Sequence, residues 1–353
     1  MKHGFGVFDH LERRGASVEG LYAGRLKLLE QYDAAGFYSY HVAEHHATPL
    51  GMAPSPGLFL AAAAQRTRRI RLGPLVYLLP LYNPFRLAVE VCMLDHLSGG
   101  RVDLGVGRGV SPFELAYLGV SFMDSRQIFE EALTALVTGL REDRLNHHGK
   151  HYRFDNVPME LRPIQRPNPP FWYGVTSPES VSFAARHGMH MVGLGPIPMV
   201  KGMTEQYREE LGRHRGGPDD LNPSAQAPIM GALRHAYVAG DEREIESIAA
   251  PAYRTYYNNI TKLWRDFRTL PAYGFTPEIG VAAKADSAIV GTASQVRDQI
   301  GRFFSESGCN YLVLSFAFGS LSDDDASRSV ERFVSHVMPS FAENSSTAAR
   351  GAG

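Results

Sequence analysis

Short apolar runs alternate with longer amphipathic segments along almost the whole chain. The apolar runs predict strands over 5–8, 38–42, 71–79, 102–106, 171–175, 189–193, 234–238 and 311–316. The amphipathic segments predict helices over 22–35, 58–67, 85–97, 126–140, 178–187, 200–214, from about 241, 293–305 and 324–338. Regular strand–helix alternation without hairpin signals favours a parallel α/β sheet. Its eightfold repetition favours closure into a (β/α)8 TIM barrel.

Two segments do not fit the repeat and predict insertions after strands 4 and 7. Residues 141–170 are rich in Pro, Arg and His, which favours an irregular excursion. Residues 251–285 are rich in aromatic side chains, which favours either a lid or substrate wall, or an oligomer contact. A doubly wound sheet is the alternative fold, but no GxGxxG follows the first strand. We therefore expect a single barrel domain over 1–341 and a disordered tail over 342–353.

Composition narrows the class of partner. The 353 residues carry a net charge of −1, and no basic stretch indicates a nucleic-acid surface. No apolar run reaches the roughly 18 residues that a membrane span needs. The two cysteines, Cys92 and Cys309, lie in apolar patterns and are expected to be buried thiols. This usage favours a reducing compartment, and we expect a cytoplasmic protein.

Candidate catalytic residues follow the second predicted strand, where Glu44, His45 and His46 are consecutive. Barrel active sites lie at the carboxyl ends of strands, so at least one of these side chains should face the mouth. Three interpretations stay open: a metal site, which would need a further ligand, a structural histidine pair, and a catalytic imidazole beside a cofactor. We take His45 and Glu44 as the candidate catalytic residues.

Three candidate anion-binding groups follow the fourth and fifth strands. Arg108 stands between two glycines, and Arg126 opens the next helix. Thr176, Ser177 and Ser180 surround the start of the helix after the fifth strand. Each group has an ordinary explanation, as a glycine-rich strand end or a helix cap. Together, at adjacent strand ends, they favour one phosphate.

The order of motifs resembles the bacterial luciferase-like family of flavin-dependent monooxygenases. The matching motifs are Glu44–His45–His46, Leu79–Pro80 with Pro84–Phe85–Arg86, 94–101, Gly107–Arg108–Gly109, Ser125–Arg126, 169–172 with Ser177–Pro178, 291–296 and 337–339. The resemblance implies a barrel that uses reduced FMN, supplied by a separate NAD(P)H:flavin reductase. It also implies that one atom of O2 enters an organic substrate through a flavin C4a-peroxide.

Site residues carried over from the family are likewise implied by the resemblance alone. The flavin phosphate would meet Arg108, Arg126, Thr176, Ser177 and Ser180. His45 would match the active-site histidine, and Leu75 and Val76 would form a bulge with a cis peptide under the flavin ring. Residues 251–285 would match a mobile lid. The family also suggests a homodimer, with residues 61–64 and the 85–97 helix at its interface.

One departure from luciferase concerns Gly107, which stands where luciferase has a reactive cysteine. We take the glycine to leave room beside the flavin, and it favours a dark monooxygenase over light emission. The substrate is expected to be a small, largely apolar molecule. Two alternatives remain: an F420-dependent oxidoreductase on the same barrel, and a flavin-binding protein without catalysis.

Overall fold

A ring of parallel strands forms the centre of the molecule in the computed structural model, which describes residues 4–15, 17–269, 274 and 276–341. The sheet runs in the order β3-β2-β1-β12-β10-β9-β8-β5-β4. Because β3 and β4 are separated only by Leu75 and Val76, the two ends of this order meet and the sheet closes. The strands are β1 (Gly4–Asp9), β2 (Ser39–Val42), β3 (Arg71–Pro74), β4 (Tyr77–Leu78), β5 (Leu104–Gly107), β8 (Phe171–Val175), β9 (His190–Gly193), β10 (Met230–Ala239) and β12 (Tyr311–Ser315).

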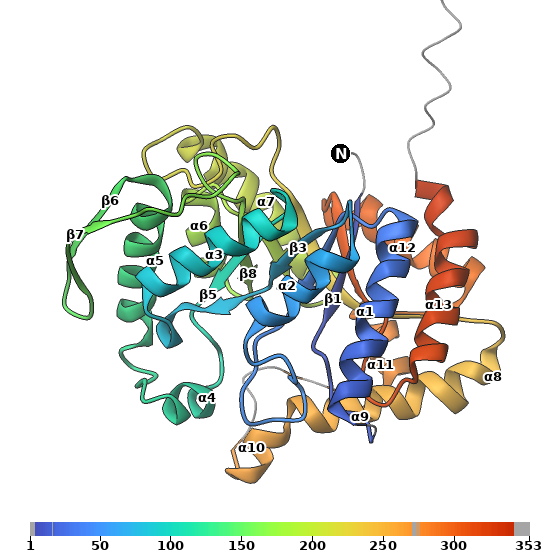
Figure 1. Ribbon diagram of the computed structural model, residues 1–353. Coiled ribbons are helices and arrows are strands. Elements are labelled where there is room, and N and C mark those ends of the chain that lie inside the picture. The colour runs from blue at the N-terminus through green and yellow to red at the C-terminus, as the bar shows by residue number, and fades with distance from the viewer. Residues whose placement is uncertain (1–3, 16, 270–273, 275, 342–353) are drawn as a thin grey trace, which may run out of the picture.

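Helices surround this ring, and Figure 1 shows them arranged around the strands. Those that follow the ring strands along the chain are α1 (Val18–Ala35), α2 (Pro56–Arg66), α3 (Pro84–Ser98), α5 (Ser125–Arg141), α6 (Pro178–Arg186), α7 (Ile197–His214), α12 (Ala293–Ser307) and α13 (Asp323–His336). Shorter elements are η1 (Leu79–Leu81), α4 (Pro112–Tyr117), α8 (Glu242–Glu244), η2 (Ile245–Ala249), α9 (Ala250–Ile260), α10 (Lys262–Asp266), α11 (Ile279–Lys284) and η3 (Met338–Phe341). The (β/α)8 barrel prediction is thus confirmed.

The structure differs from the sequence prediction in three elements. The third predicted strand is divided at Leu75–Val76, whose peptide bond is cis, as the family resemblance implies. An additional strand, β11 (Ala288–Thr292), pairs with the carboxyl half of β10, which at ten residues extends beyond its four- and five-residue neighbours β9 and β12.

The third difference is that 141–170 is not wholly irregular. It contains an antiparallel hairpin of β6 (Arg144–His148) and β7 (Arg153–Pro158). The exposed polar residues around the buried Leu145 conceal the alternation that would have indicated a strand.

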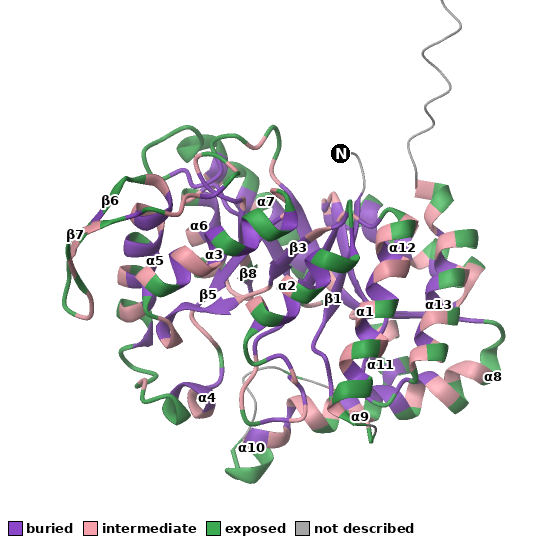
Figure 2. Cartoon of the chain, viewed as in Figure 1, coloured by how far each residue is buried: buried purple, intermediate pink, exposed green. Residues whose placement is uncertain are grey.

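Figure 2 shows the strands as mostly buried, while the helices expose their outer faces. Most of the apolar core lies between strands and helices, as expected for a barrel. The interior of the ring contains aromatic side chains that carry polar atoms. Trp172, Tyr311, His41 and His190 are all buried and pack against one another, with Trp172 4.8 Å from His190 and 4.9 Å from His41 between ring centroids.

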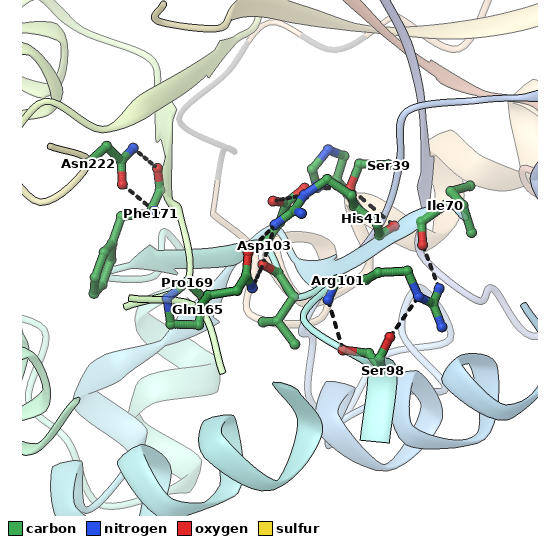
Figure 3. Close-up of polar contacts among 12 residues, drawn as sticks. Ser39, His41, Ile70, Ser98, Arg101, Asp103, Gln165, Pro169, Phe171 and Asn222 are labelled. Carbon is green, nitrogen blue, oxygen red and sulfur yellow. Dashed lines mark hydrogen bonds and ion pairs between the residues drawn. The ribbon is translucent and has the colours of Figure 1, made fainter. Parts of the chain in front are cut away.

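A hydrogen-bonded network ties the amino ends of the strands together (Figure 3). The buried carboxylate of Asp103 accepts hydrogen bonds from Ser39 Oγ at 2.8 Å and from Arg71 Nε at 2.7 Å. The side chain of Asn222 both donates to and accepts from the backbone of Phe171. These contacts stabilise the amino ends of the strands. Active sites of such barrels lie at the opposite, carboxyl ends.

Both cysteines are buried and unpaired, as predicted. Within the part of the chain that the structure describes, every helix is too short or too polar to cross a bilayer. The predicted tail over 342–353 lies outside the described residues, and the single-domain assignment over 1–341 stays a prediction.

Candidate active site

A cavity of about 310 Å³ opens at the carboxyl ends of the barrel strands. This volume falls at the lower end of the range of small-molecule sites. All nine residues predicted as catalytic or cofactor-binding line it, although they come from five separate stretches of chain. These residues are Glu44, His45, Leu75, Val76, Arg108, Arg126, Thr176, Ser177 and Ser180.

His45 is held by a carboxylate that the sequence analysis missed. Its Nδ1 lies 3.2 Å from Oε1 of Glu114, which comes from α4 and is buried. The other oxygen of Glu114 accepts a hydrogen bond from the backbone N–H of His46 at 3.3 Å. Because an ionised carboxylate can only accept, Nδ1 carries the hydrogen and Nε2 is the nitrogen left for chemistry.

The surroundings of His45 favour its protonated form. Burial by itself lowers the pKa of His45, but the charge of Glu114 and the hydrogen bond to it outweigh burial, with smaller help from Glu44 and Glu12, so its pKa is raised. The neighbouring His10 behaves oppositely. Burial, and then the proximity of His45 and His235, hold the pKa of His10 well below its usual value. Of these two imidazoles, His45 is thus the one whose surroundings favour the protonated form.

Glu44 is fully engaged by other groups. One carboxylate oxygen lies 2.9 Å from Nε2 of His46, and the other accepts the backbone N–H of Leu78 at 3.0 Å. The side chains of Glu44 and His46 therefore meet each other, while His45 turns to Glu114 on α4. Glu44 therefore lies at the cavity wall, where its hydrogen bonds connect the loop after β2 to β4.

The two candidate arginines face the far part of the same cavity. Among the described residues, neither Arg108 nor Arg126 has a hydrogen bond or an ion pair. Arg126 is exposed, so its lack of a partner is unremarkable alone, but Arg108 is half-buried. Both lie close enough to Tyr173 to oppose the rise in its pKa that burial causes. Two cations beside one cavity, neither of which forms an ion pair with the described carboxylates around it, fit an anionic ligand.

The amino end of α6 completes this part of the cavity. Ser177 and Ser180 form a reciprocal capping box at its first turn. The Oγ of Ser180 accepts the backbone N–H of Thr176 at 3.0 Å and of Ser177 at 2.9 Å. These amides converge on an oxygen at the end of a helix where negative charge is favoured. A Cβ on the adjacent Gly174 would meet no atom within 4 Å, so the cavity is open beside it.

Leu75 and Val76 form the floor between β3 and β4 and are half-buried. The expectation that Gly107 leaves room beside them is wrong. A Cβ at Gly107 would lie 2.4 Å from Cγ2 of Val76, so the valine side chain already fills that space. Glycine at 107 is required by the close approach of Val76, not by an open gap.

The aromatic insertion covers the barrel mouth, and Figure 1 shows α4, α9 and α10 at the end of the barrel away from the N-terminus. Tyr256 on α9 packs 4.1 Å from the ring of His235 and 5.7 Å from His10, which in turn lies 5.6 Å from His45. Farther out, Phe267 stacks on Phe113 with centroids 4.2 Å apart and planes 5° from parallel. Two aromatic residues of the segment 251–285, Tyr273 and Phe275, lie outside the described residues.

Glu12 anchors this insertion to two barrel loops. Its carboxylate accepts Nδ2 of Asn259 at 2.8 Å and the backbone N–H of Gly319 at 2.9 Å. The backbone carbonyl of Asn259 accepts Thr48 Oγ1 at 3.2 Å. Burial raises the pKa of Glu12 to about 7 even though these hydrogen bonds lower it. The insertion is thus fixed close to His45 by a carboxyl group that titrates near neutrality.

Glu114 was the one missed residue that the sequence could have revealed. Ser111–Pro112 followed by Glu114 has the form of a helix start directly after a barrel strand, which places Glu114 at the mouth. Glu12 and His10 had no such signal, because they lie in a loop and meet their partners only through the fold. In the described part of the chain, no group of three or more His, Cys, Asp or Glu is arranged to hold a metal ion.

Comparison with known proteins agrees with this geometry. The family model of luciferase-like monooxygenases matches residues 4–311. The uncharacterized protein y4wF of Sinorhizobium fredii is 41% identical over 338 residues, covering 96% of this chain and 97% of that protein. The oxygenase component of a flavin-dependent trigonelline monooxygenase from Acinetobacter baylyi is 28% identical, covering 96% of both chains. The crystal structure of monooxygenase RslO1 from Streptomyces bottropensis superimposes with a TM-score of 0.85 at 27% identity, covering 96% of this chain and 100% of that one. The chain belongs to the luciferase-like monooxygenase family.

Proposed function

We propose that this protein is an FMN-dependent monooxygenase that uses reduced FMN and O2 to oxygenate a small, largely apolar organic substrate. One observation carries the proposal. A single cavity has two arginines that make no ion pair among the described residues and a helix N-terminus in one part, and the hydrogen-bonded His45–Glu114 pair in another. A cofactor with a phosphate at one end and a redox-active ring at the other matches that division.

The residues present fit FMN. Its phosphate would be held by Arg108, Arg126, Thr176, Ser177 and Ser180, and its ring would lie over Leu75 and Val76. Reduced FMN supplies the two electrons that let one oxygen atom of O2 enter the substrate while the other leaves as water. The Oγ of Ser180 now satisfies the amides of Thr176 and Ser177, and a phosphate oxygen would take over those donors.

His45 supplies the proton that such chemistry consumes. Its Nε2 is free of the bond to Glu114, and Glu114 raises the pKa of His45, which favours the protonated ring. Glu114 orients the ring and stabilises its charge. Glu44, with both oxygens bonded to His46 and Leu78, acts by positioning the loop and not by contact with the reacting atoms.

The insertion excludes water from the reaction. Tyr253 and Tyr256 pack buried against His235, and the Phe113–Phe267 stack closes the side next to Glu114. An apolar cover protects reactive oxygen species from solvent, and it favours a substrate without many polar groups.

Two partners belong to the proposal. A separate NAD(P)H:flavin reductase would deliver reduced FMN, which is supported by the likeness to the oxygenase component of a two-part enzyme. A homodimer would form through α2 and α3, which expose Leu58, Met93 and Leu97. Ala63 and Ala64 are buried within the protomer, so these two residues of the expected 61–64 contact are not available to a second copy. Sedimentation of the wild-type protein against Leu58→Glu tests the dimer.

Isotope incorporation tests the oxygenation itself. Purified protein, an added flavin reductase, NADH and FMN would be incubated with aldehydes and ketones under 18O2. The proposal predicts one 18O atom in the product and a rate lowered by roughly 100-fold or more in His45→Ala. Anaerobic turnover with reduced F420, and none with FMN and O2, would favour the F420-dependent alternative.

A further inference from the structure

The turn between α4 and α5 brings an aromatic ring over one of the cavity arginines. The ring of Phe122 lies 4.9 Å from Cζ of Arg108. Within the described part of the chain, Arg108 and Arg126 are the only lysine or arginine side chains that line the cavity. Arg108 is therefore the half-buried arginine of the site, and the ring of Phe122 lies against it.

Phe122 is firmly placed by the start of α5. Its carbonyl oxygen accepts hydrogen bonds from Oγ of Ser125 at 2.6 Å and from the backbone N–H of Ser125 at 3.4 Å. Ser125 is the first residue of α5, and Arg126 follows it. The same short turn thus carries both the ring that lies against Arg108 and the second arginine of the cavity.

The type of contact matters for what Arg108 can bind. A carboxylate partner would occupy the N–H donors in the plane of the guanidinium. An aromatic ring accepts no conventional hydrogen bond from the guanidinium, so a cation–π contact leaves those donors available for an anion. Phe122 remains 37% exposed, so it screens Arg108 from the solvent side without closing the cavity.

We propose that Phe122 is a positioning residue for the cofactor phosphate. It holds the guanidinium of Arg108 without occupying its N–H donors, so that these donors stay available to the phosphate and the side chain is ordered before the phosphate arrives. This inference rests on the proposed function, because it takes the phosphate of FMN as the ligand of Arg108.

Paired titrations with FMN and riboflavin test the idea, because riboflavin lacks the phosphate. Binding of each is followed by quenching of flavin fluorescence in wild type, Phe122→Ala, Phe122→Leu and Phe122→Tyr. We expect the alanine and leucine variants to weaken FMN binding by about 2- to 30-fold, the range of a cation–π contact, and to leave riboflavin binding unchanged. Tyrosine should bind FMN as the wild type does. Met123→Ala, on the same turn and 88% exposed, is the matched control and should have no effect.

A double-mutant cycle adds a second readout. In the Arg108→Ala background, Phe122→Ala should cost nothing further if the two side chains act as one unit. The inference is overturned if Phe122→Leu binds FMN like the wild type, or if FMN and riboflavin weaken equally. It is also overturned if the two substitutions are additive. Failure of the wild type to prefer FMN over riboflavin would overturn the proposed function together with this inference.

Discussion

Nδ1 of His45 lies 3.2 Å from Oε1 of Glu114, and the carboxylate that it meets is almost completely buried. His45 lies in the loop after β2 and Glu114 lies on α4 after β5, so the pair exists only in the folded barrel. It raises the pKa of the histidine that faces the cavity. The folded-state pKa therefore lies above the unfolded value, so the pair stabilises the fold at low pH and loses that contribution as the pH rises through the folded pKa.

Replacing Glu114 by Gln should lower the pKa of His45, because burial would then meet less opposition. We expect the oxygenation rate to fall by roughly tenfold at pH 7, with the loss shrinking as the pH is lowered. Histidine NMR titration and a pH–rate profile measure both effects. Glu130→Gln, which lines the same cavity without bonding His45, is the control. An unchanged pKa of His45 in Glu114→Gln would refute the pairing.

Replacing Arg108 by Ala should weaken FMN binding by roughly 10- to 100-fold, since it removes charge-assisted hydrogen bonds to a phosphate. Arg126→Ala should have a smaller effect because that side chain is exposed. Arg144→Ala, on the exposed β6 strand, should bind FMN normally. Fluorescence titration gives the three dissociation constants for FMN. Equal affinities of the three variants would contradict the assignment of Arg108 and Arg126 to the phosphate.

Glu12→Gln should change how stability depends on pH. The pKa of Glu12 is raised to about 7 in the folded protein. The fold therefore favours the neutral carboxyl group, and wild type loses stability as the pH rises from about 4.5 through 7. The variant cannot ionise and should melt at a higher temperature than wild type above pH 8. Melting curves from pH 5 to 9 test this, and parallel curves would contradict it.

Replacing His190 by Gln should make the free energy of unfolding depend less on pH below about pH 6.5. Burial lowers the pKa of His190 to about 4, and the same holds for His41 beside Trp172. The unfolded chain binds a proton at each histidine near pH 6.5, whereas the folded protein does so only near pH 4. The free energy of unfolding is therefore higher above pH 6.5, by roughly 3 kcal/mol per residue, and this difference is lost as the pH falls towards 4. Glutamine keeps an acceptor for the N–H of Ile229, which Nδ1 of His190 now accepts at 3.1 Å. Denaturant unfolding from pH 4.5 to 7 tests this prediction. An equal change in the free energy of unfolding with pH in both proteins would contradict it.

The barrel and the site residues were accessible from the sequence for different reasons. Regular apolar runs predict the barrel, and strand ends such as Val42 and Val106 place Glu44, His45 and Arg108 at one mouth. The β6–β7 hairpin was missed because its strands are polar and mostly exposed, so they show no apolar run. The Glu12–Asn259 contact was beyond reach because it joins segments 247 residues apart, and no local pattern encodes such a pairing. The error at Gly107 has the same origin, since the position of Val76 depends on how β4 packs beside β5.

Anaerobic titration of the protein with reduced FMN tests the central claim most directly. The account predicts saturable binding of reduced FMN, at least tenfold tighter than reduced riboflavin, with the preference abolished in Arg108→Ala. Admission of air should then reoxidise the bound flavin at a rate that changes in His45→Ala. Absence of binding, or equal affinity for reduced FMN and reduced riboflavin, would contradict it.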